Sequence, residues 1–169
     1  PVGHVWTLEE MDRLFSICQQ HKVLIISDEI HQDLITGLTP FTSALTVSNG
    51  AYTDKLIAMS SLSKSFNIAS LHHAEVIIPN EELRNHYNAF KALVYHTDSD
   101  VLAEAASTAA YTHPEAEAWL MDLLNVVKEN YDYMCNKLHA TLPELRISPM
   151  DGTYLAWIDF SAYLKPEEM

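Results

Sequence analysis

The sequence predicts an α/β protein with a mostly parallel sheet, because short apolar runs alternate with helical patterns along the first half of the chain. Residues 23–27, 55–60 and 74–79 form three such runs, and their continuous hydrophobicity is typical of parallel strands buried on both faces. With 169 residues, 48% of them hydrophobic, the chain is long enough to enclose a sizeable core. In sheets of this class, ligands bind beyond the carboxyl ends of the strands.

A helix is expected before the first strand. Thr7 and Glu10 have the spacing of a capping box, in which each side chain bonds the other residue's backbone N–H. The helix should end near residues 21–22, where basic side chains suit a helix C-terminus. Its apolar positions recur at helical spacing, at Leu8, Met11, Phe15 and Cys18.

The second half of the chain is predicted to be mainly helical. Asn80 is a cap for a helix with an apolar face, and residues 98–112 are rich in alanine. Pro114 opens a third pattern of roughly 28 residues, long enough to bridge two subdomains. Residues 145–148 and 154–160 have strand patterns around a turn at Asp151 and Gly152. The apolar face after Asn80 consists of Leu83, Tyr87, Phe90 and Val94.

Composition narrows the range of partners and locations. The formal net charge is −13 and only ten residues are Lys or Arg, which argues against nucleic acid and against anionic membrane surfaces. No apolar run is long enough to span a bilayer, and no signal peptide is visible. Cys18 and Cys135 suit buried, reduced thiols in a cytoplasmic protein, although a disulfide stays open. Both ends of the chain look cut, so we expect a fragment.

Polar residues follow two of the predicted strands directly. Asp28 comes after the first strand and Lys64 lies four residues after the second, so both fall at the carboxyl edge of the sheet. Taken alone, such an aspartate is more often a turn former, and such a lysine is more often solvated. The nearby Ser61, Ser63 and His31 also have ordinary structural interpretations by themselves.

The segments around these residues resemble a known family. Residues 27–31 read Ser-Asp-Glu-Ile-His, and residues 61–67 read Ser-Leu-Ser-Lys-Ser-Phe-Asn. They resemble the signature segments of fold-type I pyridoxal 5′-phosphate (PLP) enzymes, and nearly the whole chain resembles the class I/II aminotransferase family. Within that family the segments most resemble cystathionine β-lyases and cysteine-S-conjugate β-lyases. The implied fold is a partial PLP-dependent transferase-like large domain at residues 1–113, an interdomain helix at 114–143, and the start of a small α+β domain at 144–169.

The resemblance implies a role for each candidate residue. Lys64 would form a Schiff base with the cofactor aldehyde, which requires an amine that can lose its proton. Asp28 would pair with the pyridinium nitrogen and keep the ring an electron sink. Ser61, and less clearly Ser63, would contact the phosphate. His31 stands where many aminotransferases have a tyrosine near the cofactor's phenolic oxygen.

The chain departs from the family pattern at two positions. His72 replaces an arginine that often binds the phosphate, although the β-lyase branch often lacks that arginine too. Ser70 replaces a glycine, which would distort the loop if that position needs positive φ. No metal site is expected, because adjacent His72 and His73 would point to opposite faces of a strand.

The implied activity is β-elimination from cystathionine or another cysteine S-conjugate, giving a thiol, pyruvate and ammonia. The substrate is thus a small amino acid, and family members are homodimers. Two alternatives stay open, namely transamination within the same family and a non-catalytic binding or dimerisation fragment. Because several site groups of the family lie outside these residues, we expect negligible turnover from the isolated chain.

Overall fold

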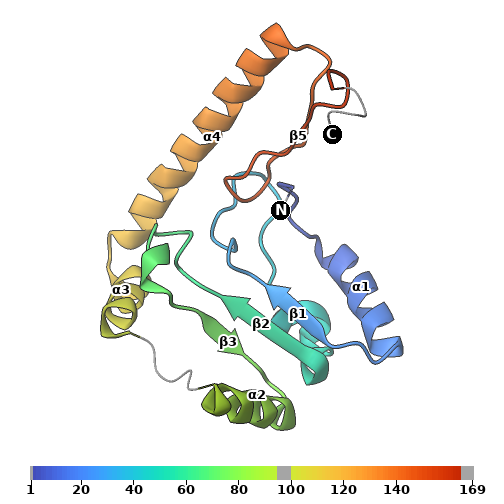
Figure 1. Ribbon diagram of the computed structural model, residues 1–169, viewed down its shortest axis with the longest axis vertical. Coiled ribbons are helices and arrows are strands. Elements are labelled where there is room, and N and C mark those ends of the chain that lie inside the picture. Colours follow the sequence, from blue (N-terminus) through green and yellow to red (C-terminus); the bar gives the residue numbers. More distant parts are fainter. Residues whose placement is uncertain (1, 95–99, 165–169) are drawn as a thin grey trace. The chain divides into compact units, whose positions relative to one another are not determined.

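The computed structural model describes residues 2–94 and 100–164 (Figure 1). Helices and strands alternate over its first half, and a long helix dominates the second half. In chain order the helices are α1 (Leu8–Gln20), α2 (Glu81–Leu93), α3 (Val101–Thr112) and α4 (Ala116–Thr141), and the strands are β1 (Ile25–Asp28), β2 (Leu56–Ser60), β3 (Glu75–Ile77), β4 (Arg146–Ile147) and β5 (Ile158–Asp159). The segments Ala44–Gly50, Thr53–Lys55 and Ala69–Leu71 are 3₁₀ helices.

The described residues separate into two compact units. One contains residues Trp6–Asp33 and Phe41–Ala116, and therefore β1 to β3 and α1 to α3. The other contains the segment up to Val5, residues Leu34–Pro40 and the chain from Glu117 onward. The domain boundaries predicted at residues 113 and 143 stay a prediction.

The first unit is organised around a three-stranded sheet in which β2 lies between β1 and β3 (Figure 1). β1 and β2 are parallel, with Ile25 opposite Leu56 and Asp28 opposite Met59. The expectation that β3 is also parallel is wrong, because β3 runs antiparallel to β2. Parallel neighbours need a crossover, usually a helix, whereas residues 61–74 contain only turns and one short 3₁₀ helix. The α/β class holds with a mixed sheet.

Helix α1 starts and ends close to the positions that its sequence predicts. The Thr7 side chain accepts from the Glu10 N–H at 3.3 Å, and a Glu10 carboxylate oxygen accepts from the Thr7 N–H at 2.8 Å. The predicted capping box is therefore confirmed. At the other end, Lys22 adopts a left-handed backbone with φ of 55°, which turns the chain toward β1. That turn explains why β1 begins at Ile25 and not at Val23 as predicted.

The core of this unit lies on one face of the sheet. Ile25 and Leu56 are opposite each other in the strand register, and both are buried against α1 and the segment Ala44–Gly50. Phe15 and Tyr52 meet edge to face, with ring centroids 5.6 Å apart. Because side chains alternate along a strand, Asp28 belongs to the opposite face from Ile25. The core cluster consists of Met11, Phe15, Ile25, Ala44, Val47, Tyr52 and Leu56.

Two predicted helices differ in detail from the expectation. Helix α2 begins after the predicted cap, with the Asn80 side chain accepting from the Leu83 N–H at 2.9 Å. Its predicted apolar face is largely exposed, however, with Phe90 65% exposed. Helix α3 begins at Val101 after the cap Asp100, and the predicted start at residue 98 lies outside the described residues.

The second unit is built around the predicted turn near Gly152. The backbone N–H groups of Asp151 and Gly152 both donate to the carbonyl of Gly3, at 2.9 and 3.0 Å. Gly3 has φ of +85°, and a Cβ there would lie 2.5 Å from the carbonyl oxygen of Pro149, so only glycine fits. Tyr131 on α4 donates to the carbonyl of Ser148 at 2.7 Å. The short strands β4 and β5, which precede and follow this turn in the chain, pair antiparallel.

The described residues also test two expectations, one about membrane spans and one about the two cysteines. Within the described ranges, the structure contains no helix with both the length and the hydrophobicity that crossing a bilayer requires. Cys18 and Cys135 are free thiols, each partly buried.

The capping box makes a testable contribution to stability. We expect Thr7→Ala to lower the free energy of unfolding by about 1 kcal/mol, since it removes a partner from an N-terminal N–H of α1. Urea unfolding followed by circular dichroism measures this difference. Gln20→Ala, an exposed change on the same helix, should stay within about 0.5 kcal/mol of wild type. Equal values for the two variants would contradict a role for the cap.

Candidate active site

The candidate site lies where β1 and β2 end. Asp28 is the last residue of β1, and it is exposed on the face opposite to the core. Its Oδ1 accepts from the Ile30 N–H at 3.2 Å. A carboxylate has about four acceptor positions in total, so this one bond leaves capacity for another donor. Asp28 can therefore serve as an acceptor for a ligand at the carboxyl edge of the sheet.

Lys64 lies on the turn that follows β2. The turn is closed by backbone hydrogen bonds from the Phe66 N–H to the Leu62 carbonyl, at 3.0 Å, and from the Ile68 N–H to the Ser63 carbonyl, at 3.1 Å. Asn67 takes a left-handed conformation with φ of 55°. The Lys64 side chain is half-buried, while its neighbours on either side are buried. The turn thus presents a single amine from an otherwise packed segment.

Electrostatics connect these two residues through His31. Burial and the positive charge of Lys64 lower the pKa of His31 from its ordinary value of 6.5, and the Asp28 carboxylate acts in the opposite direction. The charges of both residues therefore act on the protonation of His31. At pH 7 the imidazole is mainly neutral, so one ring nitrogen can donate a hydrogen bond and the other can accept one.

The two candidate serines are buried, and Ser61 already has partners. The Ser61 hydroxyl donates to the His73 carbonyl at 2.6 Å and accepts from the Ser63 N–H at 3.1 Å. Its only proton is therefore directed at the protein backbone. For Ser61 to donate to a phosphate oxygen, the hydroxyl must turn away from His73.

The two departures from the family pattern have different structural consequences. Ser70 lies within the 3₁₀ helix Ala69–Leu71 and is not a positive-φ residue, so the backbone there does not need glycine. His72 ends this helix with φ of 51°, and its side chain is exposed. Among the described residues, no group of three or more His, Cys, Asp or Glu side chains is placed to hold a metal.

Glu29 is a residue of the site that the sequence analysis missed. It follows Asp28 directly, is only 8% exposed, and extends the β1–β2 ladder through its N–H, which donates to the Met59 carbonyl at 2.7 Å. Its carboxylate accepts from the Ala44 N–H and the Ser43 hydroxyl, each at 2.8 Å, and from the Ser27 hydroxyl at 3.1 Å. Glu29 therefore holds the backbone beside Asp28 in place.

The bonds of Glu29 give a second stability prediction. We expect Glu29→Ala to lower the free energy of unfolding by about 2 kcal/mol, because it leaves the buried Ala44 N–H without its acceptor. Urea unfolding measures the loss, and Glu129→Ala on exposed α4 is the control, expected within about 0.5 kcal/mol. A Glu29→Ala protein as stable as wild type would show that Ala44 finds another acceptor.

A second contact that the sequence analysis missed joins the Lys64 turn to the residues that follow β1. Ser65 follows Lys64 and has no exposed surface, and its hydroxyl donates to Oδ2 of Asp33 at 2.7 Å. Asp33 also lies within electrostatic range of Tyr111 on α3. Burial and the Glu75 carboxylate raise the pKa of Tyr111 to about 12, with a smaller contribution from Asp33. One sequence offers no signal for this contact, because its partners are 32 residues apart.

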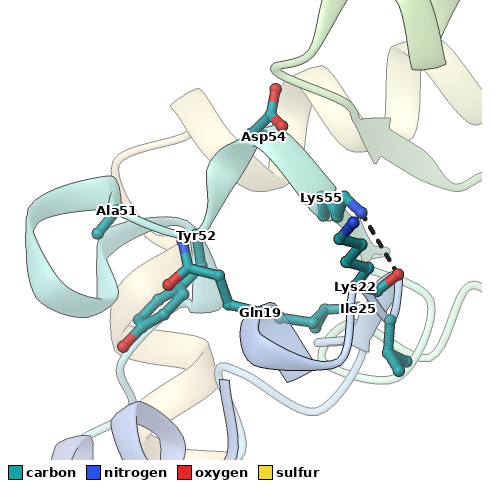
Figure 2. A pocket seen from close by; sticks show the side chains of 8 residues that line it. Gln19, Lys22, Ile25, Ala51, Tyr52, Asp54 and Lys55 are labelled. Carbon is teal, nitrogen blue, oxygen red and sulfur yellow. Dashed lines mark hydrogen bonds between the residues drawn. The ribbon is translucent and has the colours of Figure 1, made fainter. Parts of the chain in front are cut away.

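The pocket shown in Figure 2 lies at the other end of the strands. It has a volume of about 230 Å³ and includes Lys22, Ile25 and Lys55 among its lining residues, which lie at or before the amino ends of β1 and β2. The Lys55 ammonium donates to the Lys22 carbonyl at 3.3 Å (Figure 2). Neither Asp28 nor Lys64 lines this pocket, and ligands of α/β sheets bind at the opposite edge.

An α/β sheet with an amine and a carboxylate beyond the carboxyl ends of two parallel strands is an arrangement suited to a cofactor-dependent enzyme. The family comparison is more specific. Residues 1–168 match the family described as aminotransferase class I and II, and the chain belongs to that family.

Relatives and solved structures show which members are similar. The chain is 38% identical to protein MalY of Escherichia coli over 94% of its own length, and 32% identical to cystathionine beta-lyase PatB of Bacillus subtilis over 96%. It spans about two fifths of each relative's length. The PLP-bound C–S lyase from Staphylococcus hominis superimposes with a TM-score of 0.86 at 33% identity, covering 99% of this chain and 41% of that one. The chain therefore has the fold of this part of a PLP-binding lyase.

Proposed function

We propose that these residues form the lysine-bearing part of a PLP-dependent carbon–sulfur β-lyase, which acts on cystathionine or another cysteine S-conjugate. The observation that carries the proposal is the placement of Asp28 and Lys64 beyond paired parallel strands, where both charges act on His31. The names of relatives such as cystathionine beta-lyase PatB support the choice of reaction.

The side chains of the site are of the types that PLP requires. The Lys64 amine can bond covalently to an aldehyde, and the exposed Asp28 carboxylate can accept the pyridinium N–H. His31, neutral at pH 7, can donate to the phenolic oxygen. Ser61 and Ser63 can contact the phosphate once the Ser61 hydroxyl turns from His73. With His72 exposed on its turn, a further phosphate contact is left to residues outside this set.

In the proposed reaction the protein residues bind PLP, orient it and the substrate, and transfer protons. When bound, PLP supplies an electron-withdrawing ring that stabilises negative charge at the substrate Cα. Asp28 keeps the ring nitrogen protonated through its negative charge. Lys64 would be the general base that takes the Cα proton, and the sulfur that leaves Cβ would take up a proton to give the thiol. Hydrolysis of the remaining fragment gives pyruvate and ammonia.

The wider setting of the protein is part of the same proposal. We place it in the cytoplasm as a homodimer, with a small amino acid as its substrate. The free thiols of Cys18 and Cys135 support a reducing compartment. The domain layout predicted from the sequence, with the division near residues 113 and 143, belongs to this proposal too.

A substrate assay on the full-length protein that contains this chain tests the reaction. With cystathionine and added PLP, we expect pyruvate to form at a rate that does not depend on a keto acid. Amino transfer that requires a keto acid, with no pyruvate, would support the alternative activity of the family and refute the lyase. A protein that binds PLP and performs neither reaction would instead be a binding or dimerisation protein.

A further inference from the structure

The geometry points to a role for the two residues that connect the Lys64 turn to the segment carrying Asp28 and His31. We propose that Asp33, acting through the buried hydroxyl of Ser65, is a positioning residue that fixes the Lys64 amine relative to Asp28 and His31. The inference rests on the proposed function, because it concerns how Lys64 is presented to the cofactor.

The Lys64 turn needs such a support because the strand pairing ends before it. β2 stops at Ser60, and the β1–β2 ladder extends only as far as the bond from the Glu29 N–H to the Met59 carbonyl. Beyond that point the turn is closed by its own backbone bonds, which set its shape but not its distance from β1. The Ser61–His73 bond ties the start of the turn to the chain before β3, so the position of Lys64 relative to β1 depends on contacts between the turn and the residues after β1.

Ser65 supplies a directional contact of this kind. It is adjacent to Lys64, has no exposed surface, and donates its proton to Oδ2 of Asp33 at 2.7 Å. A hydroxyl donating to an ionised carboxylate forms a short, charge-assisted bond that is stronger than a bond between neutral groups. Ser65 is fully buried and Asp33 partly buried, so water has little access to the donor of this bond, and the bond restrains the residue next to Lys64 closely.

Asp33 connects the restrained residue, Ser65, to the segment that contains Asp28 and His31. It lies two residues after His31, at the end of a turn in which the Gln32 N–H donates to the Glu29 carbonyl at 2.9 Å. The same turn begins with the bond from the Ile30 N–H to Asp28. The Ser65–Asp33 bond therefore links the turn that carries the amine to the turn that carries the carboxylate and the imidazole.

A positioning role predicts a pattern of effects that a loss of stability alone does not. In the full-length, PLP-loaded protein, we expect Ser65→Ala and Asp33→Ala each to lower kcat by about 10- to 100-fold, with KM changed less than about threefold, because small displacements of a reacting group slow the chemical step. We also expect less of the bound PLP to be attached covalently to Lys64. The double variant should be no worse than either single variant, since both remove the same bond.

Two variants separate this role from ordinary effects of substitution. Asp33→Asn keeps the shape of the side chain and an acceptor oxygen for Ser65, so it should retain kcat within about fivefold of wild type. Ser107→Ala removes another buried serine hydroxyl, one with no hydrogen-bond partner among the described residues, and should leave kcat and covalent PLP unchanged. Circular dichroism and thermal unfolding identify any variant that fails to fold. If Ser65→Ala fails, Asp33→Asn against Asp33→Ala decides, and if Asp33→Ala fails, Ser65→Ala against Ser107→Ala decides.

The measurements distinguish the two proposals from each other. Total PLP after desalting, its visible absorption, and borohydride trapping at Lys64 are recorded for each protein alongside kcat and KM. A wild-type protein that holds no PLP on Lys64 would refute the proposed function itself. A wild-type protein with covalent PLP, whose Ser65→Ala and Asp33→Ala variants match Ser107→Ala, would refute only the positioning role. Multiplicative effects in the double variant, or an Asp33→Asn variant as impaired as Asp33→Ala, would also overturn it.

Discussion

Lys64→Ala is expected to abolish the visible absorption of the protein-bound cofactor and to lower lyase activity by more than about 10³-fold. This loss is expected because Lys64 is proposed both to attach PLP covalently and to remove the Cα proton. No other amine lies on the turn after β2. Lys64→Arg should fail in the same way, because a guanidinium keeps the charge but stays protonated and forms no such bond. Absorption spectra and pyruvate release on the full-length protein measure both effects.

Lys55→Ala provides the matched control for this experiment. Lys55 lies just before β2, at the opposite end of the strand from Lys64, and its ammonium bonds the Lys22 carbonyl (Figure 2). Its removal should leave the absorption band unchanged and activity within about twofold of wild type, as for a surface change away from the site. A band that survives Lys64→Ala and disappears in Lys55→Ala would refute the assignment of Lys64 and point to the pocket at the amino ends of the strands.

Local signals in the sequence predicted the helix starts well. The capping box at Thr7 and Glu10 and the cap at Asn80 were identified correctly, because a cap depends on residues only three positions apart. The direction of β3 was predicted wrongly, because it depends on the path of residues 61–74 and not on the apolar run itself. The apolar positions of α2 were correctly periodic, but periodicity does not show what covers a face, and Phe90 is exposed here.

In the candidate site too, features set by neighbouring residues were predictable, whereas contacts between residues far apart in the sequence were not. Asp28 and Lys64 can be identified from the sequence because they lie at or just after the predicted strand ends, and ligands bind at the carboxyl edge of an α/β sheet. The supporting contacts are different, because Ser65 meets Asp33 across 32 residues and Glu29 meets Ala44 across 15. A serine beside a lysine is ordinary in a sequence, and only the fold reveals that it is wholly buried against a carboxylate. Sequence therefore identifies the reacting groups better than the residues that hold them in place.

Asp28→Asn should separate cofactor attachment from catalysis. Asparagine keeps an oxygen for the Ile30 N–H, so the end of β1 should stay intact, and Lys64 should still hold PLP covalently. What the variant lacks is the negative charge that keeps the ring nitrogen protonated. We expect pyruvate release to fall by about 10²- to 10³-fold, by analogy with the loss that follows removal of one oxyanion-hole donor from an enzyme.

The control for this charge effect is Asp54→Asn. Asp54 is exposed before β2, and its carboxylate accepts from the Asn80 side chain at 2.6 Å, a bond that an asparagine oxygen can replace. Both variants lose one negative charge from the same unit, so a general electrostatic effect would lower activity in both, whereas the proposed pairing lowers it only for Asp28→Asn. Unchanged activity in Asp28→Asn would show that another group holds the ring nitrogen. Attachment of PLP through Lys64 and activation of the ring through Asp28 are separate tasks. Lys64→Ala should therefore lose the visible absorption of bound PLP, whereas Asp28→Asn should keep it.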